Sequence, residues 1–356
     1  MNVKIIIGCP GAGKSTYLAK VANTLPPDNT LILSYSRSAS MSIAMKAGRG
    51  YKASTIHSLC FHDMGIVPQQ ILQGRQIADF CKMIGIEPPN SGFEKYEPSM
   101  HQFEVYSWAR TTGTDPLEAF FRFSGMVEFT FNEYVFFVKS LLQYKSTFGV
   151  YEFHDLLDNF DPIEAPENLL VDEAQDNSYS LTMALEKLVV AGVKNMWIVG
   201  DPNQAIYTYS GADPKYMYHF DGKEKFLEQS YRCPKVIVNK AKDIFPDAHF
   251  NPLSEIGEIH REIDIPLTAD MVLVRTNYIG YKLIKRTGID KKKVLTIHKA
   301  KGLQGDHVVI YNATTRRVRT STEIDPVAEK RLMYTAITRT RKKLTIVDGG
   351  NPNEWV

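Results

Sequence analysis

The sequence has few cysteines and no long apolar run, and both absences limit what the protein can be. Its four cysteines are scattered over 356 residues and form no CxxC pair. Free thiols in a reducing compartment are therefore expected, and neither a disulfide framework nor a zinc site is predicted. The opening run "VKIIIG" is far too short for a signal peptide or a membrane span. No low-complexity tract or internal repeat is visible. We expect a soluble, intracellular protein.

The sequence also lacks a strong excess of charge of either sign. The formal net charge is +2, so any contact with nucleic acid must use a local groove rather than the field of the whole protein. A hydrophobic content of 44% and a charged content of 23% are ordinary for globular proteins and argue against wholesale disorder. The length is too great for one average domain and suits two compact ones.

A glycine-rich turn follows the first apolar run and precedes a helical pattern. Gly8, Gly13, Lys14 and Ser15 match G-x-x-x-x-G-K-[ST] in the strand–loop–helix context that the motif requires. Small residues let backbone N–H groups surround phosphate oxygens at a helix N-terminus, Lys14 reaches the β and γ phosphates, and the Ser15 hydroxyl joins Mg²⁺. The motif predicts binding of ATP or GTP, but kinases, transporters, GTPases and motors all share it.

Two carboxylates follow a second apolar strand, in "ENLLVDEAQD". The strand covers Leu169 to Val171 and ends at Asp172 and Glu173. In a parallel sheet, ligands sit at the carboxyl ends of strands. Asp172 is then placed to hold Mg²⁺, and Glu173 to deprotonate a water for attack on the γ-phosphate. A kinase needs no water-activating glutamate, so this pair favours hydrolysis. The alternative is a surface acidic turn.

A third strand, in "NMWIVGDPNQAIYTYSG", is followed by acceptors and aromatic residues in one short loop. Gln204 could reach the γ-phosphate, and Tyr207 and Tyr209 follow within five residues. Exposed aromatic faces stack on nucleic-acid bases for about 1–3 kcal/mol each. The loop could therefore couple a nucleotide to a single strand. Partial burial in the core is an equal alternative for each tyrosine.

These motifs, taken together with others further along the chain, resemble the UvrD/Rep-like branch of superfamily 1 helicases. The resemblance runs in order across nearly the whole chain and rests on eight motif matches in all, which include the three described above. They are "GCPGAGKST", "SYSRSAS" (34–40), "STIHSL" (54–59), "VYEFHDLL" (150–157) with "LLVDEAQD", "IVGDPNQAIYTYSGAD", "LEQSYRCP" (227–234), "VLTIHKAKGLQGDHVVI" (294–310) and "EKRLMYTAITRTRKKL" (329–344).

The resemblance implies an α/β fold with two RecA-like P-loop domains built on parallel sheets. The first domain is predicted at residues 1–61 and 151–212, a helical insertion at 62–150, and the second domain at 213–356. Helical periodicity in "ILQGRQIADFCKMIG" and "FNEYVFFVKSLLQYK" supports the insertion. Most members carry a large insertion in the second domain, where this chain has only residues 278–293, which favours translocation over unwinding by this chain alone.

The resemblance also implies an ATP site in the cleft between the two domains. Arg339 would be the arginine finger, Arg232 a second γ-phosphate contact and Tyr231 the residue that stacks on adenine. A surface ion pair is the alternative for either arginine. The implied catalytic residues are Lys14, Glu173, Gln204, Arg232 and Arg339. The implied nucleotide contacts are Gly8, Gly11, Gly13, Lys14, Ser15, Thr16, Tyr231 and Gln304, with Ser15 and Asp172 on Mg²⁺. Three positions depart from the family pattern. Thr16 and Ser210 stand where most members have arginine, and Gln304 stands where they have glutamate.

Nucleic-acid contacts carry over from the family less firmly. The positions that match groove-lining residues are Tyr35, His57, Tyr207, Tyr209, Thr296, His298 and Lys299. A buried, hydrogen-bonded histidine is the alternative for His57 and His298. Thr55 is a further candidate for a backbone contact. The basic runs at 291–293 and at Arg316, Arg317 and Arg319 are only suggestive, because such runs are usually solvated loops.

The predicted function is an ATP-dependent DNA helicase or translocase that moves 3′→5′ on single-stranded DNA. The alternatives are a translocase that removes bound proteins without unwinding, and a nucleotide-gated nucleic-acid-binding module. The expected cofactors are ATP and Mg²⁺. The expected partners are single-stranded DNA or a single-strand/duplex junction, with a loading, replication or repair protein as a further option and no membrane. We expect a monomer in the cytoplasm of a bacterial, archaeal or phage-infected cell.

Overall fold

The structure is a computed structural model that describes residues 1–48, 50–89, 100–266, 268–314 and 325–349. Arg316, Arg317 and Arg319 lie outside the described residues. The chain divides into two compact units. The first comprises Met1–Lys4, Leu18–Ile198 and Ser210–Gly222, and the second comprises Ile5–Tyr17, Val199–Tyr209 and Lys223–Val356. The domain boundaries predicted from the sequence stay predictions.

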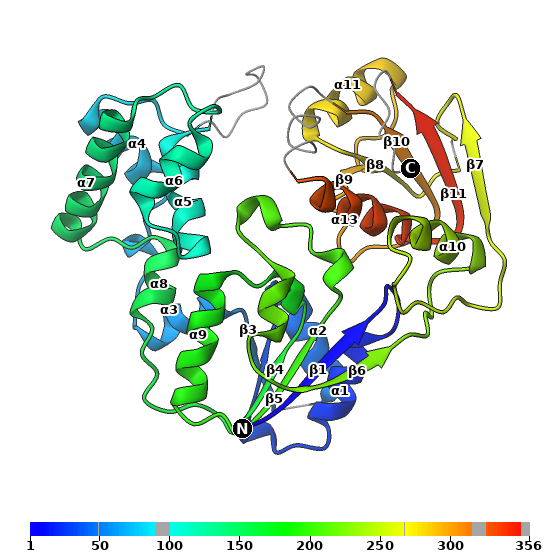
Figure 1. Cartoon of the computed structure of the whole chain (residues 1–356), viewed down its shortest axis with the longest axis horizontal. Coiled ribbons are helices and arrows are strands. Elements are labelled where there is room, and N and C mark those ends of the chain that lie inside the picture. The colour runs from blue at the N-terminus through cyan, green and yellow to red at the C-terminus, as the bar shows by residue number, and fades with distance from the viewer. Residues whose placement is uncertain (49, 90–99, 267, 315–324, 350–356) are drawn as a thin grey trace. The chain divides into compact units, whose positions relative to one another are not determined.

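Six strands form the first sheet, in the order β3-β2-β4-β5-β1-β6 (Figure 1). The pairs β2–β3, β2–β4 and β4–β5 are parallel. Every residue of β2 and β4 is buried, as expected for strands of a parallel sheet that is covered on both faces. The strands are β1 (Asn2–Gly8), β2 (Thr30–Leu33), β3 (Lys52–Ser54), β4 (Asn168–Val171), β5 (Asn195–Gly200) and β6 (Lys223–Leu227).

Hydroxyl caps fix where the helices beside this sheet begin. Ser36, Thr55 and Ser178 each accept a hydrogen bond from a backbone N–H in the first turn of the helix that follows. The helices are α1 (Lys14–Ala22), α2 (Arg37–Ala47), α3 (Ile56–Asp63), α8 (Phe153–Asn159) and α9 (Tyr179–Val190). Short 3₁₀ turns lie at η1 (Pro27–Asn29), η2 (Pro68–Gln70), η3 (Ala174–Asp176), η4 (Pro202–Gln204), η5 (Thr208–Ser210) and η6 (Pro214–Tyr218).

Four helices between β3 and β4 form a cluster with a core of its own (Figure 1). They are α4 (Arg75–Ile84), α5 (Gln102–Thr112), α6 (Pro116–Phe123) and α7 (Phe131–Phe148). Thr130 and Glu133 form a capping box at the start of α7, and Gly149 ends it in the left-handed conformation. Phe80 and Phe137 are fully buried between the helices. The helical periodicity predicted for this stretch is confirmed in α4 and α7.

The second sheet has five strands in the order β7-β11-β10-β8-β9. The pairs β10–β11, β8–β10, β7–β11 and β8–β9 are parallel. The strands are β7 (Glu258–Glu262), β8 (Met271–Val274), β9 (Val294–Thr296), β10 (Gly305–Asn312) and β11 (Thr340–Asp348), and the helices are α10 (Lys235–Ile244), α11 (Asn277–Thr287) and α13 (Pro326–Ile337). The segment 278–293 holds most of α11 and the turn to β9.

Two parallel sheets with surrounding helices confirm the predicted α/β class. The three strands expected before the P-loop, before Asp172 and before Asp201 are β1, β4 and β5. They are consecutive in the sheet order, with β5 between the other two. All four cysteines are free, as predicted, and all four are buried. Among the described residues, no helix is both long and apolar enough to cross a membrane.

Candidate nucleotide and nucleic-acid site

The P-loop closes around its own lysine. Lys14 donates from Nζ to the carbonyl oxygens of Gly8 and Cys9, at 2.9 and 3.4 Å. Gly11 and Gly13 have φ angles of +77° and +78°, in the left-handed region that favours glycine. A Cβ added at Gly8 would lie 2.6 Å from Lys14 Cγ. Glycine at position 8 therefore lets the Lys14 side chain lie against the end of the strand, and glycines at 11 and 13 let the loop take the left-handed turns of a phosphate-binding loop.

The segment around Tyr231 is bonded directly to this loop within the second unit. Ser230 donates from Oγ to the carbonyl oxygen of Pro10 at 2.8 Å, and the Tyr231 N–H donates to the carbonyl oxygen of Gly11 at 2.9 Å. A Cβ at Gly11 would lie 2.5 Å from Arg232 Cβ. Glycine at position 11 is thus required both by its backbone conformation and by the close approach of Arg232.

Tyr231 and Arg232 have different surroundings. Tyr231 is 72% exposed, so its ring is available for stacking. Arg232 donates from Nε to Gln304 Oε1 at 2.7 Å and from Nη1 to the Thr338 carbonyl at 3.3 Å. Gln304 therefore holds Arg232 through a neutral amide oxygen. The structure brings these predicted residues together with the P-loop.

Arg339 is buried and is bonded to Gln204. It is 2% exposed and donates from Nη2 to Gln204 Oε1 at 2.7 Å, while its Nε donates to the Thr335 carbonyl at 3.0 Å. Gln204 in turn donates from Nε2 to Asp201 Oδ2 at 2.6 Å. The surface ion pair considered for Arg339 is wrong. The arginine belongs to a buried polar chain that joins the segment after β5 to the end of α13.

The carboxylates after β4 belong to the first unit. Asp172 is 2% exposed, and its N–H donates to the Leu33 carbonyl at 2.9 Å. Glu173 has φ and ψ of 56° and 35°. Among the described residues it is the only non-glycine residue with positive φ. Gln175 donates from Nε2 to Glu173 Oε2. Asp172 is therefore no surface turn, and a left-handed backbone at Glu173 is a strained conformation of the kind that occurs at functional sites.

Three aromatic rings gather at the end of the Gln204 loop. The ring centroids of Tyr209 and His298 are 5.5 Å apart at 88°, and those of Tyr207 and His298 are 5.9 Å apart. Tyr209 is 68% exposed, whereas Tyr207 is partly buried against the core of the second unit. Lys301 lies over the Tyr207 ring at 5.1 Å and donates to the Gln204 carbonyl at 3.2 Å. Tyr209 offers an exposed face, while Tyr207 is partly buried, as the alternative for the tyrosines predicted.

The other predicted contacts near this cluster are mostly engaged with the protein itself. His298 donates from Nε2 to the Ile206 carbonyl at 3.2 Å, and burial lowers its pKa to about 4, with Arg275 nearby adding to the effect. Thr296 is 8% exposed and its Oγ1 accepts from the Lys299 N–H at 3.3 Å. Lys299 donates from Nζ to Asn277 Oδ1 at 3.4 Å. His298 is therefore neutral and hydrogen-bonded near pH 7.

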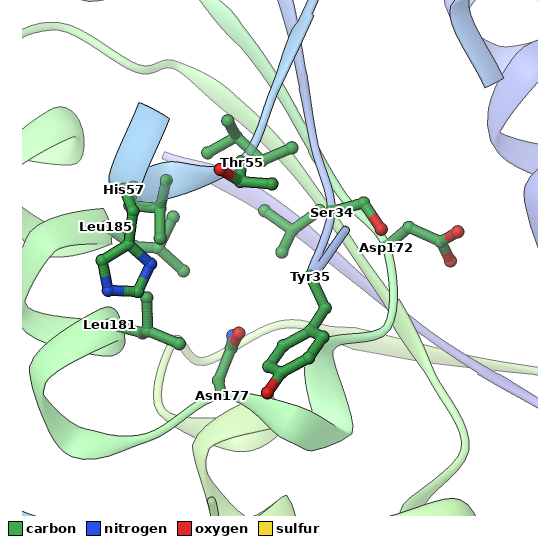
Figure 2. A pocket seen from close by; sticks show the side chains of 11 residues that line it. Ser34, Tyr35, Thr55, His57, Asp172, Asn177, Leu181 and Leu185 are labelled. Carbon is green, nitrogen blue, oxygen red and sulfur yellow. The ribbon is translucent and has the colours of Figure 1, made fainter. Parts of the chain in front are cut away.

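Tyr35 and His57 line a cavity of about 270 Å³ in the first unit (Figure 2). Tyr35 is 50% exposed, and Figure 2 shows its ring, the Asn177 amide and the His57 imidazole around the space. The His57 ring meets Phe153 edge-on at 5.9 Å, and burial lowers the His57 pKa to about 4. The complete lining is Leu33, Ser34, Tyr35, Thr55, Ile56, His57, Val171, Asp172, Asn177, Leu181 and Leu185.

Sequence reasoning missed several residues that hold this arrangement. Asp201 accepts from Gln204, Ser230 bonds the P-loop, and Lys301 covers Tyr207. Asp201 and Ser230 stand in quoted motifs, so their position in the pattern was a usable signal. Asn177 and the α9 leucines of the cavity carried no such signal, because their role depends on how α9 packs.

Comparisons with known families cover most of the chain. A family model described as an AAA domain matches residues 1–210, and a model of the UvrD-like helicase C-terminal domain matches residues 273–348. The chain belongs to the UvrD/Rep-like branch of superfamily 1 helicases. The two matched segments contain the predicted ATP-site residues of this UvrD-like chain, except Tyr231 and Arg232, which lie between them.

Individual relatives match over shorter stretches. The UvrD-like chain is 38% identical over 79 residues to the ATP-dependent DNA helicase PcrA of Staphylococcus aureus, which is 21% of this chain and 11% of that protein. It is 39% identical over 79 residues to the same helicase of Staphylococcus epidermidis. The matched stretch therefore spans about a tenth of these curated relatives. A solved structure, the Arterivirus nonstructural protein 10 helicase in complex with DNA, is similar with a TM-score of 0.50 at 14% identity, covering 99% of this chain and 62% of that one. That likeness supports the fold alone.

Proposed function

We propose that this chain is an ATP-dependent helicase or translocase that moves 3′→5′ on single-stranded DNA. Membership of the UvrD/Rep-like branch supports the reaction class. The observation that carries the proposal is the bond between Arg339 and Gln204, because the Gln204 loop ends in Tyr207 and Tyr209. A group that responds to the γ-phosphate is thus five residues from an exposed ring that can stack on a base.

The nucleotide roles follow from the charges and bonds described above. Lys14 binds the β and γ phosphates, and Arg339 and Arg232 stabilise the charge that develops as the γ-phosphate leaves. Such arginines contribute about 10³–10⁵ in rate. Glu173 orients and deprotonates the attacking water, and Tyr231 stacks on the adenine. Further nucleotide contacts are proposed at Gly8, Gly11, Gly13, Ser15, Thr16 and Gln304.

The P-loop offers donors for the phosphates of ATP, and the carboxylate after β4 offers an oxygen ligand for Mg²⁺. The P-loop glycines let Lys14 lie against the loop backbone, and Asp172 supplies the hard oxygen donor that Mg²⁺ prefers. Ser15 and Asp172 are the proposed ligands. When bound, Mg²⁺ neutralises charge on the phosphate oxygens. Lys14, Arg232 and Arg339 supply the remaining positive charge around the phosphates.

The proposed DNA contacts form two groups. Tyr209 stacks on a base, and Tyr207 and His298 support its ring. Tyr35 and His57 line the cavity of the first unit, whose walls combine aliphatic side chains with polar ones, as the apolar faces and polar edge of a base need. Thr296 and Lys299 are proposed as backbone contacts. Both histidines are neutral near pH 7, so they take part as rings and hydrogen-bond donors rather than as phosphate-binding cations.

The test is the rate of ATP hydrolysis with and without oligo-dT, at low and moderate salt. Strong stimulation in the wild type and none in Lys14→Ala supports the proposal. ATP binding without any stimulation would mean that Tyr209 is not a stacking platform on DNA, and RNA and protein activators would be the next ligands to try.

Direction needs a separate measurement. Streptavidin displacement from oligo-dT biotinylated at either end reports which end the protein reaches first. Faster displacement from the 5′ end is expected for 3′→5′ motion. Faster displacement from the 3′ end would reverse the assignment.

A second candidate is removal of bound proteins without unwinding. It is favoured by the short segment 278–293, which holds α11 where most relatives carry a large insertion. Displacement of streptavidin without separation of a forked duplex would select this candidate. A Glu173→Gln protein that binds DNA in an ATP-dependent way and keeps its full biological activity would instead indicate a nucleotide-gated binding module. The monomeric state and a cytoplasmic location stay predictions.

A further inference from the structure

The loop that carries Tyr209 ends against the helical insertion. The chain passes from the second unit to the first between Tyr209 and Ser210. Gly211, the next residue, is buried and has a φ of +95°. A Cβ at Gly211 would lie 2.7 Å from Thr111 Cγ2 and 3.0 Å from Thr112 Cγ2. Only glycine fits between this backbone and the last turn of α5.

Hydrogen bonds hold both methyl groups in place. Thr111 Oγ1 donates to the Ser107 carbonyl at 2.7 Å and lies 2.7 Å from His154 Nε2. Thr112 Oγ1 lies 2.9 Å from both the Trp108 carbonyl oxygen and Thr114 Oγ1. Because each hydroxyl is engaged, each side chain has one rotamer, and its Cγ2 methyl faces Gly211.

The chain after Gly211 is also attached firmly to the first unit. Ala212 forms an antiparallel bridge with Ser178, and the Asp213 N–H donates to the Asn177 carbonyl at 3.0 Å. Asp213 also caps η6 by accepting from the Lys215 N–H at 2.9 Å. The end of the Tyr209 loop is therefore held on one side by Asn177 and Ser178, and on the other by α5.

The position of α5 is itself fixed by buried charges. Arg110 donates to Asp155 Oδ1 at 3.0 Å, and Lys145 of α7 donates to Asp155 Oδ2 at 2.8 Å and to Glu152 Oε2 at 2.8 Å. Lys145 is 8% exposed. Removing one partner of such a buried group is costly, so α5 and α7 are firmly tied to α8. The insertion therefore presents Thr111 and Thr112 to Gly211 on a rigid support.

We propose that the packing of Thr111 and Thr112 on Gly211 lets the helical insertion fix the end of the Gln204–Tyr209 loop and so set how strongly DNA accelerates ATP hydrolysis. Gly211 is a positioning residue, since it acts through the loop. The effect on hydrolysis rests on the proposed function, whereas the fixing of the loop does not.

The test compares Gly211→Ala with Gly85→Ala and with the triple variant Gly211→Ala/Thr111→Ser/Thr112→Ser. Gly85 also has positive φ, +75°, but has no atom within 4 Å of an added Cβ. It therefore reports the cost of the backbone conformation without a clash. Serine keeps both hydroxyl hydrogen bonds and removes only the two methyl groups that face Gly211.

The first readout is amide hydrogen exchange of residues 201–209 in the protein without ligands. These amides are expected to exchange faster in Gly211→Ala than in the wild type. The exchange rate should be unchanged in Gly85→Ala and should return part of the way to the wild-type rate in the triple variant. Equal exchange in Gly211→Ala and wild type would overturn the inference, whatever the protein does with DNA.

The second readout is the ratio of ATPase rates with and without oligo-dT. Gly211→Ala is expected to lower this ratio by about 5-fold or more while the basal rate stays, and the triple variant to recover part of it. A ratio unchanged by Gly211→Ala, or lowered but not recovered in the triple variant, would contradict the inference. If wild type itself shows no stimulation, the proposed function fails, and the exchange result alone decides the inference.

Discussion

Arg339 donates a 2.7 Å hydrogen bond to Gln204, which is 135 residues earlier in the chain. The bond is buried and is continued to Asp201 at 2.6 Å. A buried polar chain of this kind acts as one unit, since each member loses its partner when another is removed.

The effects of substituting Gln204 and Arg339 on the ATPase rate are therefore expected to be non-additive. Gln204→Ala and Arg339→Ala should each lower the DNA-stimulated ATPase rate at least about 10²-fold, and the double variant should be little worse than the poorer single variant. A double-mutant cycle on the stimulated rate measures this coupling. Lys215→Ala, on the surface, is the control. Effects that multiply fully would show that the two residues act independently.

Gly11 and Gly13 form a matched pair for stability. Their φ angles are +77° and +78°, but a Cβ at Gly11 meets Arg232 at 2.5 Å, whereas the nearest atom to one at Gly13 is 3.9 Å away. Gly11→Ala should therefore lower the free energy of unfolding by about 1–3 kcal/mol more than Gly13→Ala. Urea titration of the two variants measures the difference. Equal losses would mean that the backbone conformation alone requires glycine here.

Replacing Glu173 by glycine should raise the stability of the protein and lower its ATPase activity. Its left-handed backbone costs a side chain about 1–2 kcal/mol, part of which glycine recovers. Glu173→Gly should be more stable than Glu173→Gln by about 0.5–1 kcal/mol. Both should bind ATP and hydrolyse it at least about 10²-fold more slowly. Thermal unfolding and single-turnover ATPase measure the two effects, and normal hydrolysis in Glu173→Gln would remove Glu173 from the proposed base role.

Alanine variants of Tyr209 and Tyr207 should differ in whether they lose DNA binding alone or both DNA binding and stability. Tyr209 is 68% exposed, so Tyr209→Ala should weaken oligo-dT binding by about 1–3 kcal/mol without changing the free energy of unfolding. Tyr207 packs on the core, so Tyr207→Ala should lower both. Fluorescence anisotropy and urea unfolding measure them, with Tyr209→Phe as the control that keeps the ring. Unchanged binding in Tyr209→Ala would contradict stacking.

Acid should destabilise the protein through His57. Burial lowers its pKa to about 4, while an unfolded histidine titrates near 6.5. Between these values the unfolded state binds more protons than the folded state. The contribution of His57 to the free energy of unfolding is therefore fully present above about pH 6.5 and is lost as the pH drops toward 4. The free energy of unfolding of His57→Gln should fall less over this range. An identical slope in the variant and wild type would show that His57 does not contribute.

The sequence by itself determined the local features. Gly8, Lys14, Asp172 and Gln204 could be predicted as site residues because each stands at or just after the end of an apolar strand in a fixed pattern, and a strand followed by a turn and a helix needs only local chain geometry. The same reasoning predicted β1, β4, β5 and the helices α4 and α7, whose periodicity shows directly in the residues.

Only the tertiary structure decided the long-range contacts. That Gln204 accepts from Arg339, that Ser230 bonds the P-loop and that Thr111 packs on Gly211 depend on how distant elements fold together. Local sequence propensity does not predict contacts between residues that are far apart in the chain. It was also the packing of the second unit that left Tyr209 exposed and buried part of Tyr207, since two tyrosines two positions apart carry no difference in sequence that could distinguish them.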